Sequence, residues 1–194
     1  MKILRTIVRF IFCKLLYRVE FTGKENIDMS KSNVIVANHV GSMDAIFIWA
    51  NVENISIMAK EELFKFKPLG WIFKKFGIFP IARGKKDFAH VHHAVKVVTA
   101  KEPRNLLIFP EGTRKARLKN VKAKNGATYI AATAGVQMVP IHITENYKLF
   151  SKIRVNCFEA IDLKISKGNI KDRELLNSET QRVMQTIYSE GCKW

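Results

Sequence analysis

The sequence is short of cysteine, of glycine and proline, and of acidic residues, and each shortage excludes a class of protein. Its 194 residues include three cysteines, which stand far apart and form no C-x-x-C pair, so neither a disulfide framework nor a zinc site is expected. With 10 Gly and 5 Pro the chain is neither fibrous nor of low complexity, and its 47% hydrophobic content excludes intrinsic disorder. A chain of this length can bury a core of its own, and its unpaired cysteines indicate a reducing compartment.

Acidic residues are outnumbered, because 17 Asp and Glu stand against 33 Lys and Arg and leave a net charge of +16. Such an excess predicts an anionic partner. Nucleic acid, anionic lipid, a phosphorylated substrate and an acidic carrier protein all fit, and composition does not choose among them.

The N-terminus lacks a long apolar run, since MKILRTIVRFIFCKLLYRVEF has no uncharged stretch beyond four residues. It therefore predicts neither a transmembrane helix nor a signal peptide. At about 100° per residue, Lys2, Arg5 and Arg9 lie opposite an apolar face that consists of Ile3, Leu4, Ile7, Val8 and Ile11. This pattern is typical of a helix in the membrane surface, although a helix packed on the protein's own core would also show it. We expect residues 1–18 to form an amphipathic, membrane-associating helix ahead of a single domain over 19–194.

Beyond the N-terminus, short β-rich runs alternate with helical stretches. Strands are predicted at 19–22, 33–37, 55–59, 77–81, 105–109, 137–143 and 153–159, and helices at 42–52, 61–75, 85–101, 126–135 and 172–190. Such alternation predicts one α/β layer domain with a mostly parallel sheet of about seven strands flanked by helices. Ligands of such sheets bind beyond the carboxyl ends of the strands, so polar residues that directly follow strands are candidate site residues.

The first such segment is NHVGSMD, in which His39 and Asp44 follow a buried strand that ends at Asn38. On one continuous helix the two side chains would point too far apart for contact. With His39 in the loop and Asp44 in the first helical turn, the carboxylate can hold one ring N–H and leave the other nitrogen to take a proton. A pair that only caps the helix is the alternative.

Three further segments follow or form apolar strands. Arg83 leaves one strand beside Gly84, and arginine suits bidentate phosphate binding. In Phe109–Arg114 a strand is followed by a proline, an acidic residue, a glycine, a hydroxyl residue and a basic residue. A sharp turn at Gly112 would expose backbone N–H groups that can hold an anion or an oxyanion. Val139–Ile141 indicates only a buried strand that contains a proline.

Taken in this order, the four segments resemble the motifs of the glycerolipid acyltransferase superfamily, and most closely those of the 1-acylglycerol-3-phosphate (lysophosphatidic acid) acyltransferases. Asn38, His39 and Asp44 match its N-H-x-x-x-x-D motif, and FPEGTR at 109–114 matches its third motif without a substitution. The second motif corresponds to 77–83 and the fourth to 139–141. The sequence departs from the family at Gly41-Ser42, at Pro80, and in its short C-terminal part.

The resemblance implies a reaction and a role for each residue. His39 would be the general base, with Asp44 orienting it and stabilising the imidazolium. The phosphate of the substrate would be bound by Arg83 and Arg114. Glu111, Gly112 and Thr113 would position the substrate, with Glu111 accepting from substrate hydroxyls or positioning an arginine. No metal or cofactor is required, and residues 19–194 would be the acyltransferase domain.

The resemblance also implies partners: lysophosphatidic acid as acceptor, and an acyl carrier protein or coenzyme A thioester as donor. With the basic charge it predicts a peripheral or monotopic protein on an anionic membrane surface, at the cytoplasmic face of the cell membrane, and no nucleic acid. Segment 63–76, rich in aromatics and lysine, would contact that membrane or line the acyl chain, with core aromatics as the alternative. Segment 114–124, with six basic residues in eleven, would attract anionic lipid or an acidic carrier protein, with a solvated loop as the alternative. The rival interpretations are an acyltransferase for another lysolipid, and a non-enzymatic basic protein that binds membranes or nucleic acid.

Overall fold

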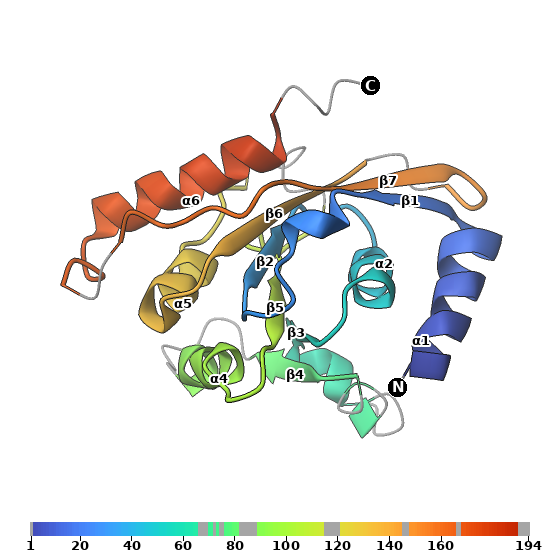
Figure 1. Cartoon of the computed structure of the whole chain (residues 1–194), viewed down its shortest axis with the longest axis horizontal. Helices are drawn as coiled ribbons and strands as arrows, with labels where there is room; N and C mark the ends of the chain where they lie inside the picture. The colour runs from blue at the N-terminus through green and yellow to red at the C-terminus, as the bar shows by residue number, and fades with distance from the viewer. Residues whose placement is uncertain are drawn as a thin grey trace.

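In a computed structural model, the chain forms one seven-stranded sheet with helices on both faces (Figure 1). The structure describes residues 2–65, 70–71, 73, 76–81, 89–114, 121–144, 148–165 and 168–189. The strands are β1 (Arg18–Thr22), β2 (Val34–Ala37), β3 (Ile55–Lys60), β4 (Ile78–Ile81), β5 (Asn105–Ile108), β6 (Met138–Ile143) and β7 (Lys152–Cys157), in the spatial order β1-β7-β6-β2-β5-β3-β4. Of the neighbouring pairs, β6–β7 alone is antiparallel. The prediction of a mostly parallel sheet of about seven strands is confirmed.

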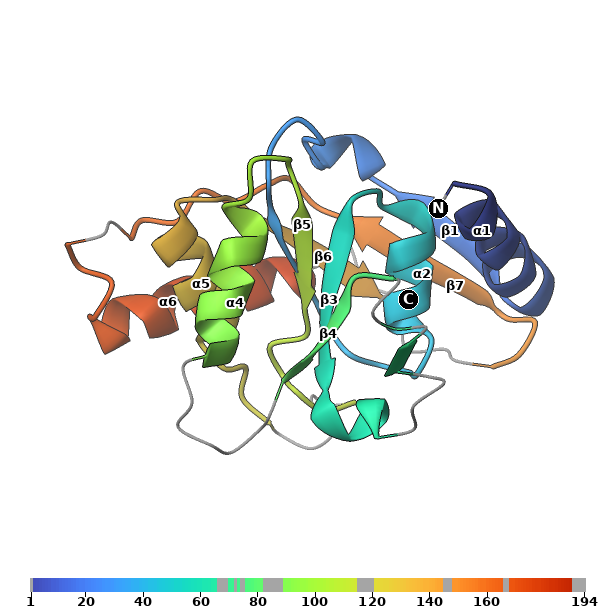
Figure 2. The same cartoon turned by 90° about the horizontal axis from the view of Figure 1, so that it is seen from below.

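The helices divide between the two faces of this sheet (Figure 2). One face carries α1 (Lys2–Val8), its continuation as the π-helix η1 (Arg9–Leu16), and α2 (Asp44–Asn51); the other carries α4 (Ala89–Val98), α5 (Gly126–Ala134) and α6 (Arg173–Ile187). Short 3-10 turns stand at η2 (Lys24–Asn26) and η3 (Glu61–Phe64). The helix predicted over 61–75 begins with η3, and much of the rest of it lies outside the described residues.

Burial of the sheet on both faces explains why its central strands are continuous apolar runs. In β2, Ile35 and Ala37 pack with the α2 side, while Val34 and Val36 pack with α4, α5 and α6. All four side chains are buried. Alternation of polar and apolar residues is therefore lost in β2, as expected for a parallel strand covered on both sides.

The N-terminal helix turns its apolar stripe outward. Ile3 is 79% exposed, and large exposed side chains continue along the helix at Leu4, Ile7, Phe10, Ile11 and Leu15. The opposite side of the helix packs on the protein through Cys13 and Arg5. The Arg5 guanidinium lies 4.7 Å from the centre of the Trp49 ring. Val8, predicted on the apolar face, instead packs on the core, which corrects the predicted face by one residue. Among the described residues, no helix combines the length and apolarity needed to cross a bilayer.

Two of the three cysteines are enclosed in the core. Burial raises the pKa of the Cys13 thiol to about 11 and that of Cys157 to about 12. Both thiols therefore carry little of the reactive thiolate at neutral pH. Cys192 lies outside the described residues.

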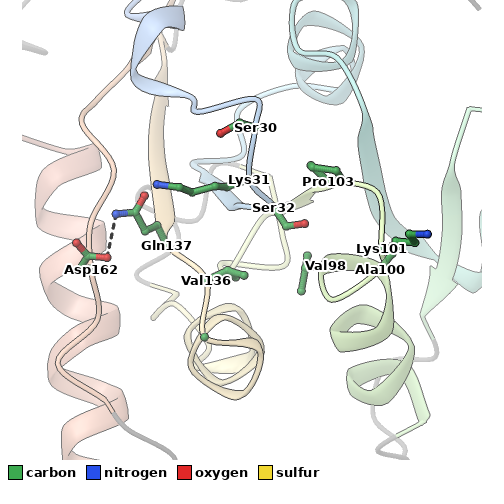
Figure 3. A pocket seen from close by; sticks show the side chains of 11 residues that line it. Ser30, Lys31, Ser32, Val98, Ala100, Lys101, Pro103, Val136, Gln137 and Asp162 are labelled. Carbon is green, nitrogen blue, oxygen red and sulfur yellow. Dashed lines mark hydrogen bonds between the residues drawn. The ribbon is translucent and has the colours of Figure 1, made fainter.

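The amino ends of the central strands border a shallow hollow of about 460 Å³ (Figure 3). It is lined by residues 30–32 before β2, by Pro103 before β5 and by 135–137 before β6. On its rim Gln137 donates a hydrogen bond of 2.9 Å to Asp162 Oδ1. This hollow therefore lies at the amino ends of the strands, whereas the segments that follow β2 and β5 lie at the carboxyl ends.

Candidate active site

The carboxyl ends of β2 and β5 lie side by side, and the connections that follow them lead to opposite faces of the sheet. The two strands are parallel neighbours, and Val36 pairs with Ile108 near their ends. After β2 the chain enters α2 on one face of the sheet, whereas the segment after β5 leads to α5 on the other face. Adjacent strands whose connections diverge in this way leave a crevice in which α/β proteins bind ligands. The first and third predicted motifs both begin here.

His39 and Asp44 are in contact, as the sequence predicted. His39 Nδ1 lies 2.7 Å from Asp44 Oδ2, and the same oxygen accepts hydrogen bonds from the backbone N–H groups of Val40 and Gly41 at 2.7 and 2.9 Å. Asp44 is the first residue of α2 and is fully buried, so its charge depends on these three hydrogen bonds. The carboxylate thus holds the loop before α2 and the imidazole with one oxygen, and among the described contacts no side chain caps the first turn of α2.

This arrangement defines which ring nitrogen is available for chemistry. A carboxylate only accepts hydrogen bonds, so Nδ1 carries the hydrogen and Nε2 keeps its lone pair. The His39 side chain is 22% exposed, against none of Asp44. Its ring stacks on Phe109, which follows β5, with the centroids 4.4 Å apart. A ring held at one edge and on one face is oriented for proton transfer at Nε2.

Glu111 has partners that the sequence did not predict. One carboxylate oxygen, Oε2, accepts from the backbone N–H of His39 at 3.1 Å, and the other, Oε1, accepts from the Tyr188 hydroxyl at 2.6 Å. The side chain is 4% exposed. No ion pair among the described residues joins Glu111 to an arginine. In this structure Glu111 links the backbone of His39 to the end of α6, 77 residues further along the chain.

The turn after β5 contains Gly112, where the sequence predicted a sharp turn. Gly112 has φ +64°, and its N–H donates to the carbonyl of Phe109 at 3.0 Å. An oxyanion bound at this N–H would therefore compete with the Phe109 carbonyl for it. Thr113 is half-buried and Arg114 is exposed at the end of the turn. Arg83 lies outside the described residues, as does much of each basic segment, 63–76 and 114–124.

The comparisons with known proteins agree with this geometry. The family model described as Acyltransferase matches residues 18–144, which include both motifs of the crevice. The chain belongs to the acyltransferase family. It is similar to the 1-acyl-sn-glycerol-3-phosphate acyltransferase of Bacillus subtilis (33% identical over 124 residues, 63% of this chain and 60% of the relative). It is also similar to the alpha enzyme of that name from Mus musculus (30% identical over 156 residues, 78% of this chain and 54% of the relative).

A solved structure supports the fold of this acyltransferase-family chain. The 1-acyl-sn-glycerophosphate (LPA) acyltransferase PlsC of Thermotoga maritima superposes with a TM-score of 0.71 at 21% identity, covering 99% of this chain and 80% of that one. The chain spans only 54 to 60% of the length of the curated relatives named above. Strand β7, helix α6 and Tyr188 follow the segment that the family model matches.

Three histidines of this acyltransferase-family chain lie on α4, on the opposite face of the sheet from α2. His90, His92 and His93 belong to the helix predicted over 85–101, and His92 and His93 are exposed. Within the part of the chain that the structure describes, no group of three or more His, Cys, Asp or Glu side chains is placed to hold a metal ion.

Asn38 connects the end of β2 to the end of β6. Its Nδ2 donates to the Ile143 carbonyl at 2.8 Å and its Oδ1 accepts from the Ile143 N–H at 2.7 Å, and the side chain is 1% exposed. This double hydrogen bond fixes the strand directly before His39. Its amide therefore supports the site without touching the reacting groups.

Removal of this amide is expected to destabilise the protein. In Asn38→Ala both backbone groups of Ile143 would stay buried without that partner, and we expect the free energy of unfolding to fall by about 2–4 kcal/mol. Urea denaturation followed by circular dichroism measures this change. Gln181→Ala, on the exposed side of α6, is the control and should stay within about 0.5 kcal/mol of the parent. Equal stabilities of the two variants would contradict the structural role of Asn38.

Proposed function

We propose that the chain transfers a fatty acyl group from an acyl thioester to the free hydroxyl of 1-acylglycerol 3-phosphate, giving phosphatidic acid. The observation that carries the proposal is the contact of 2.7 Å between His39 Nδ1 and the fully buried Asp44. A protein that merely binds anionic surfaces needs positive charge but no such pair. The names of the relatives at 30 and 33% identity support the same reaction.

The proposed chemistry is proton abstraction coupled to acyl transfer. His39 Nε2 takes the proton of the acceptor hydroxyl while the hydroxyl oxygen attacks the carbonyl carbon of the thioester. The product of this attack is a tetrahedral oxyanion. Collapse of this intermediate breaks the carbon–sulfur bond, and the leaving thiolate takes the proton back from His39. Asp44 stabilises the imidazolium between these steps, and Glu111 holds the His39 backbone in place. Backbone N–H groups of the turn after Phe109 are proposed to stabilise the oxyanion.

The acceptor phosphate is proposed to bind Arg114 and Arg83. Arg114 is exposed and follows the Gly112 turn directly, so its guanidinium is free to meet a ligand above the carboxyl ends of the strands. A guanidinium binds a phosphate through two parallel hydrogen bonds, which also fix the orientation of the glycerol. Arg83 enters the proposal through the resemblance of its segment to the family's second motif.

We further propose that the N-terminal helix and the Leu149–Phe150 turn bind the membrane together. Leu149 and Phe150 are 55% and 58% exposed. The turn adjoins the helix, since the Phe150 N–H donates to the Leu16 carbonyl at 2.8 Å and the Arg18 guanidinium donates to the Phe150 carbonyl. The two segments are therefore adjacent, and both expose large apolar side chains. Such a surface beside basic residues suits insertion among anionic headgroups.

Substitution of two side chains on this surface is expected to weaken membrane binding. Phe10→Ser combined with Phe150→Ser removes two exposed aromatic rings, and we expect at least a tenfold fall in the partition coefficient onto phosphatidylglycerol vesicles. Sedimentation of vesicles with bound protein measures the partition. The matched control, Phe10→Leu with Phe150→Leu, keeps the surface apolar and should retain most of the binding. Equal binding by both double variants would refute a membrane role for these residues.

The reaction itself is tested by incubating the purified protein with lysophosphatidic acid and an acyl thioester. The thioester of acyl carrier protein and that of coenzyme A are supplied in separate incubations. Mass spectrometry of the lipid product is expected to give phosphatidic acid, and the productive incubation names the donor. A parallel incubation with a lyso-aminolipid tests the rival acceptor. Acylation of that lipid alone would replace the acceptor, and the absence of product from every pair would refute the proposed function.

A further inference from the structure

Helix α6 is attached to the rest of the protein along its length and delivers Tyr188 to the crevice. Val183 and Ile187 are buried in the core cluster on the face of the sheet that α4, α5 and α6 cover. Thr180 contacts Thr128 of α5 through their hydroxyls at 2.7 Å, and Asp172 caps the first turn by accepting from two backbone N–H groups. A residue at the C-terminal end of so firmly packed a helix has a defined position. Tyr188 is that residue.

The Tyr188 side chain ends on a buried carboxylate of the site. Its hydroxyl donates to Glu111 Oε1 at 2.6 Å, and its ring meets the edge of His142 from β6 at 6.1 Å between centroids. Glu111 is 4% exposed, so a hydrogen-bond donor to each oxygen offsets much of the cost of burying its charge. Without the hydroxyl, Oε1 would have lost this donor, and among the described contacts the carboxylate would be held only by the His39 N–H at Oε2.

We propose that Tyr188 is a positioning residue for His39, which acts through Glu111. The hydroxyl fixes the rotamer of Glu111, the second oxygen of Glu111 fixes the His39 N–H, and the imidazole therefore keeps its alignment with Asp44 and the substrate. The effect on turnover rests on the proposed acyl transfer, whereas the effect on His39 does not. The C-terminal helix is thus a part of the active site, although the family match ends at residue 144.

A double-mutant cycle tests this chain of contacts through turnover. Tyr188→Phe removes only the hydroxyl, and we expect the turnover number to fall about tenfold with the KM for lysophosphatidic acid changed less than twofold. Because Tyr188 acts through Glu111, adding Tyr188→Phe to Glu111→Ala, which removes both carboxylate contacts, should cost nothing further. Losses that multiply in the double variant would overturn the proposal. Tyr129→Phe is the control, since the Tyr129 hydroxyl makes no hydrogen bond among the described residues, and it should retain full turnover.

A second measurement separates this proposal from the proposed function. The backbone amide resonance of His39 in a ¹H–¹⁵N NMR spectrum is expected to move in Tyr188→Phe and in Glu111→Ala, and to stay in place in Tyr129→Phe. If the wild-type protein acylates no lysolipid, the proposed function fails while a moved His39 resonance still supports the Tyr188 contact. An unmoved resonance in Tyr188→Phe, with the cooperative unfolding transition intact, overturns the positioning role whatever the activity.

Discussion

His39→Ala is expected to lower the turnover number for acyl transfer by about 10³-fold or more. The substitution removes the only imidazole that the described residues place against the buried Asp44, and general base catalysis typically contributes about 10²- to 10⁴-fold. A thiol-release assay with lysophosphatidic acid as acceptor measures the rate.

Binding of the acceptor should survive this substitution, because His39 contributes to the reaction rather than to the attachment of the phosphate. Equilibrium binding of lysophosphatidic acid is therefore expected within about threefold of the parent. His92→Ala is the matched control, since His92 is exposed on α4 and should retain full turnover. Near-parental turnover in His39→Ala would refute the mechanism.

Asp44→Asn is expected to reduce turnover by about 10²- to 10³-fold while leaving the loop in place. The Val40 and Gly41 N–H groups both point at Oδ2, so the amide oxygen must occupy that position and continue to accept from His39 Nδ1. The tautomer is kept, but the negative charge that stabilises the imidazolium is lost. Steady-state kinetics measures the fall in turnover.

The same substitution should also destabilise the fold. Its NH₂ group takes the place of Oδ1, which is buried and has no hydrogen-bond partner among the described residues. A buried donor without an acceptor costs about 1–3 kcal/mol, which urea denaturation detects. Asp162→Asn, whose parent carboxylate is exposed and accepts only from Gln137 among the described contacts, is the control for both measurements. Unchanged turnover in Asp44→Asn would show that the charge of Asp44 has no part in catalysis.

The sequence predicted those features that depend on contiguous residues. The strands were found because a parallel sheet covered on both faces consists of short, uninterrupted apolar runs, of which Val34–Ala37 is an example. The pairing of His39 with Asp44 was found because both belong to one loop and the start of one helix. Helix 126–135 was placed within one residue of α5 for the same local reasons.

The features that the sequence did not predict depend on distant residues. Glu111 and Tyr188 are 77 residues apart, and no spacing in the sequence connects a tyrosine at a helix end to a glutamate in a turn. The orientation of Val8 also escaped prediction, since the helix packs through Arg5 and Cys13 against Trp49 and Asn51 of α2. Periodicity defines the faces of a helix but not the neighbour that each face meets.

The edge strand β1 has a consequence for the order in which the chain can fold. Its neighbour in the sheet is β7, with Arg18 opposite Lys152 and Thr22 opposite Asn156. During synthesis, therefore, β1 has no partner until more than 130 further residues have followed it, as the register of Thr22 with Asn156 requires. Contacts of such long range slow folding. The amphipathic helix that precedes β1 keeps its apolar side chains exposed even in the folded protein, so they are available to chaperones or to a membrane while β1 is still unpaired.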